Sequence, residues 1–331
     1  MRFSTFIISL ALFLLAFPTM SRAQNNGHPH SPIMLSINVN EGNYRPAKVS
    51  YLGTQIGGGP NVFNFVQTGD NQKFVSNGLS IGYQPSVSAL KDYIFSFSFS
   101  NFIAYQSENF GTLDPAGGTL LIAGVGVGAT GVGFGLPGPN NQITEGAYKS
   151  TLDGYDVALG VKRSMALLDD RLTVSPSVGL QYKKLWSQNI LSGNIPFFVR
   201  QFGYDTKLNI ESFSPTLGLD LNYMIDSGIS IFGGVQYVYD FNNGKGYDSL
   251  AFTGFDTQTL RLSNDKSTDS HKAHLGVSYT FQNSITFSLE GHYQSLGNTP
   301  LLDVRTSIAP VRFSYKKSEI YSAGLKLSYR F

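Results

Sequence analysis

Residues 320–331 read IYSAGLKLSYRF, and they decide how the rest of the sequence is interpreted. Every second side chain from Tyr321 to Phe331 is apolar or aromatic, and the side chains between them are small or polar: Ser322, Gly324, Lys326, Ser328 and Arg330. Successive side chains of a β-strand point to opposite faces. The stretch is therefore predicted to be a strand with one apolar and one polar face.

The same alternation recurs along the whole chain. Several of the alternating segments reach about 9–11 residues, the length that a tilted strand needs to cross a bilayer. We predict an all-β fold of about ten strands, with twelve as the alternative count. The alternating segments are residues 33–39, 75–83, 93–105, 155–161, 172–186, 213–223, 229–241, 273–281, 285–293 and 321–331.

The connections between these segments alternate in length. Short connections are expected at residues 85–92, 164–170, 226–228 and 282–284, and long ones at 46–73, 106–147, 188–208, 242–268 and 297–316. Strict alternation of short and long connections is typical of an antiparallel up-and-down transmembrane β-barrel with short periplasmic turns and long extracellular loops. Aromatic residues of the apolar face also gather near both strand ends, as expected at two membrane interfaces.

The N-terminal residues indicate export. Arg2 precedes an apolar run from Phe6 to Phe17, and the small residues Ser21 and Ala23 suit a signal-peptidase site. The run is too short for a spanning helix, which needs about 20 residues. We predict a cleaved signal peptide at 1–23, a short disordered tail at 24–32 and a single barrel domain at 33–331.

Charge and composition exclude several classes of protein. The segment 1–23 contains two of the 24 basic residues, so the remaining 22 balance the 22 acidic residues. A nucleic-acid binder would show a basic excess, so we expect no nucleic-acid partner. The sequence has no cysteine and only five histidines, and we expect neither a metal site nor a cofactor.

The signal segment, the alternating strands and the terminal strand YSAGLKLSYRF together resemble a Gram-negative outer-membrane β-barrel protein. The resemblance implies a location in the cell outer membrane, with outer-membrane lipid and the barrel-assembly machinery as partners. It also implies that the last strand, through Tyr329 and Phe331, carries the signal read by that machinery.

The inward face of the predicted barrel carries most of the candidate functional residues. Unpaired buried charges are costly, so opposite charges on this face are expected to pair with each other. A lumen of about eight strands is just filled by side chains, and a ten-stranded lumen is predicted to be narrow or plugged. The expected luminal charge network is Asp156, Lys162, Lys183, Asp220, Asp240, Lys272, His274, Glu290, His292, Lys326 and Arg330.

Three functions follow from these observations. We predict a barrel with a narrow or plugged pore for small solutes, or with a structural role, and without catalytic residues. An adhesin or receptor acting through long surface loops is the alternative. A third hypothesis is a rim hydrolase similar to the omptin proteases, which pair acidic residues with a histidine. The glycine-rich stretch 120–138 is a further candidate for a constriction inside the barrel mouth.

Overall fold

A computed structural model describes residues 33–46, 50–56, 61–67, 71–113, 119–122, 143–168, 171–195, 200–254, 257–281, 284–303 and 312–331. The expected signal peptide and tail, and most of the glycine-rich stretch, lie outside the described residues. Within these ranges, no helix is long and apolar enough to cross a membrane.

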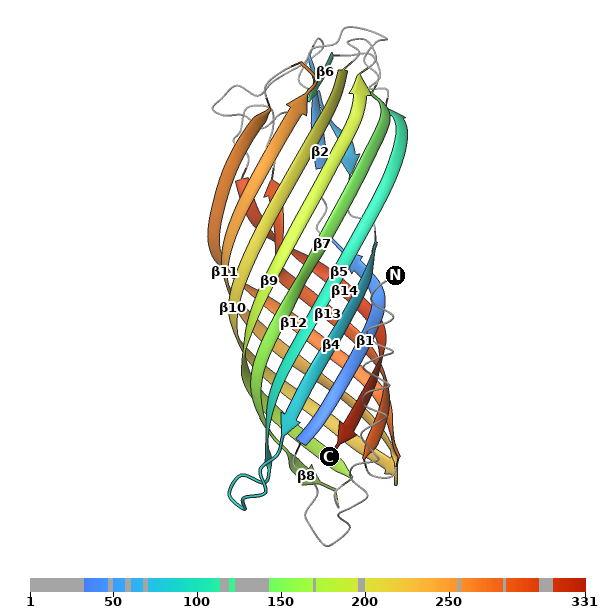
Figure 1. Cartoon of the computed structure of the whole chain (residues 1–331), viewed down its shortest axis with the longest axis vertical. Coiled ribbons are helices and arrows are strands. Elements are labelled where there is room, and N and C mark those ends of the chain that lie inside the picture. Colours follow the sequence, from blue (N-terminus) through green and yellow to red (C-terminus); the bar gives the residue numbers. More distant parts are fainter. Residues whose placement is uncertain are drawn as a thin grey trace.

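Ten long strands of the described ranges close an antiparallel barrel (Figure 1), as predicted. Neighbours in sequence pair with each other, and the first strand pairs with the last. The strands are β1 (Ile33–Arg45), β4 (Gln72–Tyr83), β5 (Tyr93–Leu113), β7 (Ile143–Arg163), β9 (Leu172–Ile195), β10 (Arg200–Asp226), β11 (Ile229–Phe252), β12 (Gln258–Phe281), β13 (Ile285–Asp303) and β14 (Arg312–Arg330).

The strands are staggered as barrel closure requires. We can step from Ile37 on β1 to its partner on the neighbouring strand and continue from strand to strand around the barrel. The path through β4, β5, β7, β9 and β10 reaches Phe241 on β11. The opposite path, through β14, β13 and β12, reaches Ile229 on β11, so the two paths differ by 12 residues. This stagger tilts the strands visibly in Figure 1.

Among the residues that the structure describes, four short strands lie outside the barrel ladder. β8 (Met165–Leu167) folds back on β9 at the lower end of the barrel as drawn in Figure 1. β2 (Ser50–Ile56), β3 (Asn61–Gln67) and β6 (Thr119–Ile122) form a separate antiparallel sheet at the upper end. This sheet was not predicted, because its strands lie in segments 46–73 and 106–147, which were assigned to loops.

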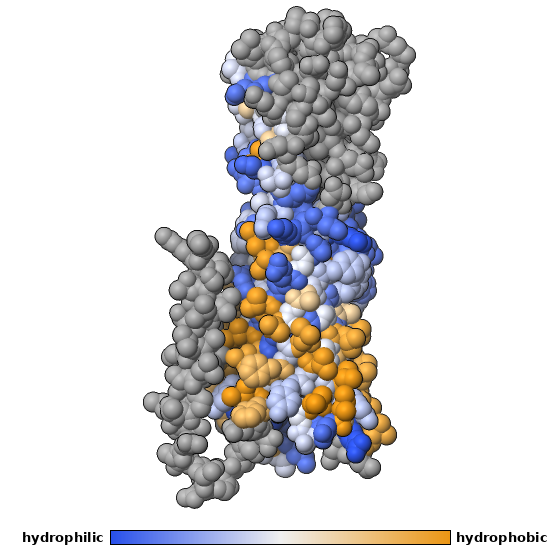
Figure 2. Space-filling model, turned by 90° about the vertical axis from the view of Figure 1, so that its right-hand side faces the viewer, coloured by the Kyte–Doolittle hydropathy of each residue, from blue (hydrophilic) through white to orange (hydrophobic). Residues whose placement is uncertain are grey.

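The lower part of the barrel has an apolar outer surface, which we call the lipid-facing band. Figure 2 shows orange, hydrophobic side chains gathered over the lower barrel and blue, hydrophilic ones above them. The predicted apolar outer face is confirmed, because every barrel strand exposes at least one apolar side chain on this surface. Examples, one from each strand, are Ile33, Ile81, Phe97, Leu159, Val178, Leu219, Val235, Leu275, Leu289 and Leu325.

The polarity of the two faces reverses above the lipid-facing band. The strand β10 has 27 residues, whereas about 11 suffice to cross a bilayer. On its upper part Lys207 and Glu211 point outward, while Leu208 and Ile210 are buried inside. An apolar interior with a charged exterior is the arrangement of a soluble protein, so water surrounds this part of the barrel. The segments 188–208 and 242–268 were expected to be loops, but most of their residues extend the strands.

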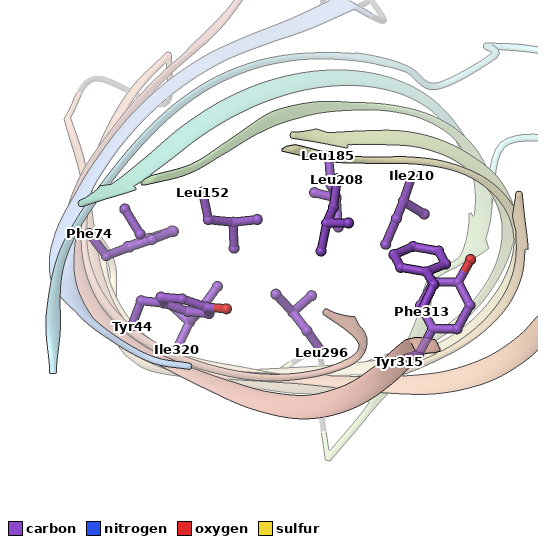
Figure 3. Close-up of a cluster of buried hydrophobic side chains, with 11 residues drawn as sticks. Tyr44, Phe74, Leu152, Leu185, Leu208, Ile210, Leu296, Phe313, Tyr315 and Ile320 are labelled. Carbon is purple, nitrogen blue, oxygen red and sulfur yellow. The ribbon is translucent and has the colours of Figure 1, made fainter. Parts of the chain in front are cut away.

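Buried apolar side chains fill the interior of this upper part. Figure 3 shows them pointing from the barrel wall into the space that the strands enclose. They come from β1, β4, β5, β7, β9, β10, β13 and β14, so they close the lumen from nearly every side. We call this group the luminal apolar cluster: Tyr44, Phe74, Ala104, Leu152, Leu185, Leu208, Ile210, Leu296, Phe313, Tyr315 and Ile320.

The upper end of the β13–β14 hairpin contributes to the cluster by bending into the lumen. The ladder between β12 and β13 ends at the pair His271 and Ser295, and the β13–β14 register shifts just above, between Leu296 and Thr299. Leu296–Pro300 are all buried, which an exposed wall strand would not allow. We call the residues 296–300 and 313–315 the inner hairpin segment.

Contacts across the barrel hold the inner hairpin segment in place. Asn298 Nδ2 donates hydrogen bonds to Ser212 Oγ at 3.2 Å on β10 and to Asn242 Oδ1 at 3.3 Å on β11. Phe313 and Tyr315 lie directly against Gly244 of β11, where a Cβ would collide with both rings. Asn264 Nδ2 of β12 donates to the Phe313 carbonyl at 2.7 Å. The bent hairpin is therefore packed as part of the interior.

Candidate functional site: the charged lumen and its apolar closure

Two deeply buried charges of the lumen form an ion pair. Lys183 Nζ on β9 lies 3.5 Å from Asp240 Oδ1 on β11, and their side chains are 2% and 0% exposed. The Asp240 carboxylate also accepts hydrogen bonds from Ser214 Oγ at 2.7 Å and from Ser270 Oγ at 2.6 Å. These donors from β10 and β12 compensate the loss of hydration of the carboxylate.

Further charges lie at the same level of the lumen. Asp156 on β7 is paired in register with Lys183 and accepts a hydrogen bond from Ser100 Oγ at 2.8 Å. Lys272 reaches from β12 to β9, where its Nζ lies 3.5 Å from Gln181 Oε1. Lys272 thus extends across the lumen between strands that do not pair.

A second charged cluster lies lower in the barrel. His292 Nε2 is 3.2 Å from Glu290 Oε2, and Lys326 Nζ is 3.6 Å from Glu290 Oε1. His274 Nε2 is 3.8 Å from Asp220 Oδ1. The two imidazole rings lie 6.2 Å apart, on residues that pair across β12 and β13.

The two remaining residues of the expected network lie near the lower end. Lys162 of β7 is close enough to Asp220 to interact with it electrostatically. Arg330 is exposed, and its backbone N–H donates to the Ser284 carbonyl at 2.8 Å beside a short turn. The structure thus brings most of the expected residues into two clusters and leaves Arg330 at the rim.

A cavity of about 320 Å³, the luminal chamber, lies between the charged side chains and the luminal apolar cluster. Phe74, Phe102, Leu296 and Ile320 line it on the apolar side. Its polar lining includes Asn40, Ser76, Ser100, Asp156, Lys183, Lys272, Glu290, His292, Ser322 and Lys326. A neighbouring cavity of about 280 Å³ shares Lys272, His292 and Gln294 with the chamber and includes Asp220 and His274.

The inner hairpin segment is the functional element that sequence reasoning missed. The stretch 295–302 reads SLGNTPLL, and Gly297 and Pro300 interrupt its alternation. Glycine and proline within a strand often mark a bulge or a bend, so this signal was available. The constriction was sought instead in residues 120–138, of which 123–138 lie outside the described residues.

The terminal strand closes the barrel seam. The backbone N–H of Phe331 donates to the Ile33 carbonyl at 3.1 Å, and the β14 register runs from Arg330, opposite Met34, upward along β1. The rings of Tyr329 and Phe331 lie 4.8 Å apart, edge to face. Both residues therefore sit where the first and last strands meet at the lower end of the barrel.

The closed barrel, its lipid-facing band and its polar lower lumen define an outer-membrane β-barrel protein, with short periplasmic turns at the lower end. The sequence model of the autotransporter β-domain family matches residues 105–293, more than half of the chain. The chain belongs to the autotransporter β-domain family.

Solved structures of outer-membrane barrels are similar at low sequence identity. The outer membrane protease OmpT from Escherichia coli is 12% identical, with 93% of this chain and 100% of that chain covered and a TM-score of 0.46. The translocator domain of the autotransporter NalP from Neisseria meningitidis is 11% identical, with both chains covered completely and a TM-score of 0.41. No curated protein matches the sequence.

Proposed function

We propose that the protein is a plugged outer-membrane barrel, closed to passive flow at its extracellular end, with a polar lumen that serves small solutes from the periplasmic end. The observation that carries this proposal is the inner hairpin segment, which packs against β10, β11 and β12 inside the barrel. The proposal extends to assembly, in which the barrel-assembly machinery reads the terminal strand after export through a cleaved signal peptide.

The loss of hydration opposes the passage of ions through the lumen. An ion that crosses a layer of buried apolar side chains loses hydration without gaining a partner, which costs several kcal/mol or more. The luminal apolar cluster supplies such a layer, with Leu185, Ile210 and Leu296 each at most 1% exposed. Below it, the pair of Lys183 and Asp240 links β9 to β11 along the inside of the barrel wall, and Lys272 reaches across the lumen to Gln181. The apolar layer and these charged side chains oppose passive flow.

Solute uptake into liposomes tests the plug. The double variant Phe313→Ala with Tyr315→Ala removes the rings that lie against Gly244, and it should accelerate the swelling of liposomes in an arabinose solution. The unmodified protein should leave swelling at the rate of protein-free liposomes. The variant Tyr321→Ala removes a lipid-facing ring from the same strand and is the control. Rapid swelling with the unmodified protein would contradict the proposal.

A second candidate is an adhesin or receptor on the cell surface. Strands β9, β11 and β12 each have 24 residues and extend well above the lipid-facing band. The sheet of β2, β3 and β6 adds further surface at that end. Binding of whole expressing cells to host or matrix components, lost when residues 50–67 are deleted, would favour this candidate.

Translocation and hydrolysis are less well supported. Passage of a polypeptide through this barrel requires that the inner hairpin segment leave the lumen. The histidine pair His274 and His292 lies below the luminal apolar cluster rather than at the outer rim, so a substrate at the cell surface has no route to it. We therefore assign no catalytic role to these residues.

A further inference from the structure

The luminal chamber presents buried polar atoms that no neighbouring side chain satisfies. Among the described residues, Lys183 Nζ and Glu290 Oε1 have no hydrogen-bond partner, although each belongs to an ion pair. The two side chains are 2% and 7% exposed, and both line the chamber. A buried polar atom without a hydrogen bond is destabilising, so a ligand that satisfies it gains affinity.

The chemistry of these atoms specifies the ligand. The Lys183 ammonium offers donors, because it carries three N–H groups, makes no hydrogen bond and contacts Asp240 only at 3.5 Å. The Glu290 carboxylate oxygen offers an acceptor. Lys272 adds a second cation to the lining, and Phe74 and Phe102 form an apolar wall with ring centroids 5.9 Å apart. A matching ligand carries a carboxylate, a hydrogen-bond donor and a flat apolar body.

The size of the chamber sets an upper limit on this ligand. Its volume of about 320 Å³ is at the lower end of the range of small-molecule sites, about 300–1,000 Å³. We propose that the luminal chamber binds a small carboxylate that also carries a hydroxyl or ammonium donor. This inference does not depend on the assignment to the autotransporter β-domain family. It rests on the proposed function in one respect: the closed extracellular end determines from which side the ligand enters.

Access is from the periplasmic end. Lys326 and Asp220, in the lower lumen, are 35% and 39% exposed, whereas Lys183 is nearly fully buried. Lys326 lines the chamber itself, and the neighbouring cavity, which Asp220 lines, shares Lys272 and His292 with the chamber. On the extracellular side, Leu296 and Ile320 belong to both the chamber lining and the luminal apolar cluster.

The test is calorimetric titration of the full-length protein, folded in detergent, with 4-hydroxybenzoate. Two related compounds each lack one feature of 4-hydroxybenzoate: 4-hydroxybenzamide lacks the negative charge, and benzoate lacks the hydroxyl donor. We expect 4-hydroxybenzoate to bind and both relatives to bind more weakly, the uncharged amide by about tenfold or more, as expected for loss of a charge-assisted hydrogen bond.

Variants locate the site. Lys272→Gln should weaken binding of 4-hydroxybenzoate about tenfold, since it removes a cation from the lining. Asp156→Asn should strengthen it, because a carboxylate that competes for Lys183 loses its charge. Glu290→Gln should weaken 4-hydroxybenzoate relative to benzoate, because it removes the charge of an acceptor that only 4-hydroxybenzoate can engage. Lys317→Gln, which alters an exposed lysine paired with Asp269 outside the barrel, is the control and should change nothing.

Three results would overturn the inference. They are the absence of binding by 4-hydroxybenzoate at millimolar concentration, equal binding of the uncharged amide, and equal weakening by Lys272→Gln and Asp156→Asn. These titrations use protein in detergent and do not depend on whether the barrel conducts. A conducting barrel that binds the carboxylate would thus refute the plug alone, and a closed barrel without binding would refute this inference alone.

Discussion

Lys183 and Asp240 lie 3.5 Å apart on strands that are not neighbours, with β10 between them, and neither side chain is exposed to solvent to a significant extent. The pair therefore ties β9 to β11 across the inside of the barrel wall. Removing one partner of a buried ion pair typically costs about 3–5 kcal/mol, because the other charge stays buried without compensation.

Asp240→Asn should lower the stability of the barrel by about 3–5 kcal/mol. The double variant Lys183→Met with Asp240→Asn should lose less, since no charge remains buried alone. Denaturant unfolding in detergent, followed by the heat-modifiable band on a gel, measures both. Asp269→Asn, which removes an exposed carboxylate from β12, should cost at most about 1 kcal/mol. Equal stability of the single and the control variant would contradict this account of the pair.

The upper limit of the lipid-facing band can be located on a single strand. Leu219 and Asn209 both point outward from β10, but Leu219 lies within the band and Asn209 lies above it among charged residues. Leu219→Lys should destabilise the barrel in lipid vesicles by about 2–4 kcal/mol, whereas Asn209→Lys should cost about 0–1 kcal/mol. Equal costs would mean that the band extends over the whole outer surface.

The terminal strand should be critical for assembly. Tyr329→Ser with Phe331→Ser should reduce the fraction of folded protein in outer-membrane preparations far more than Tyr321→Ser. Tyr321 and Tyr329 lie on the same face of β14, and Phe331 follows the strand directly, but Tyr321 is at the other end of the lipid-facing band. Comparable levels of both variants would show that assembly does not depend on the residues at the barrel seam.

The inner hairpin segment can be tested by cross-linking two engineered cysteines. The chain has no cysteine, so Asn242→Cys with Asn298→Cys introduces the only two thiols. The two asparagine side chains are hydrogen-bonded in the structure, so a short bifunctional thiol reagent such as dibromobimane should link the two cysteines within one molecule, as intact mass spectrometry would reveal. Asn209→Cys with Asn298→Cys places one thiol outside the wall and should stay unlinked. Linkage in the control alone would place the hairpin outside the barrel.

The barrel itself was predictable because strand alternation has a period of two, which assigns every side chain to one face. The inward positions of Asp156, Lys183 and Asp240 follow from that parity alone. Their pairing partners do not, because parity gives no information on which side chains meet across the lumen. Lys183 was thus placed correctly inside, while its contact with Asp240 required the structure.

The apolar closure was not predicted, for two physical reasons. The expected strands ended where the outer face stops being apolar, so Leu208 and Ile210 were assigned to a loop or its edge. Where a strand extends into water, its inner face is apolar and its outer face polar, which is the reverse of its membrane-spanning part. A search for outward-facing apolar residues therefore does not detect the extension. The inward bend at Gly297 depends on contacts with Ser270 and Asn242 that lie far away in sequence.

The conductance of the purified, unmodified protein in planar lipid bilayers tests the plugged barrel most directly. We expect small and infrequent current steps, because the luminal apolar cluster and the inner hairpin segment fill the extracellular half of the lumen. Phe313→Ala with Tyr315→Ala should enlarge the steps or make them more frequent. A large and steady, porin-sized conductance of the unmodified protein would contradict the account and identify an open diffusion channel.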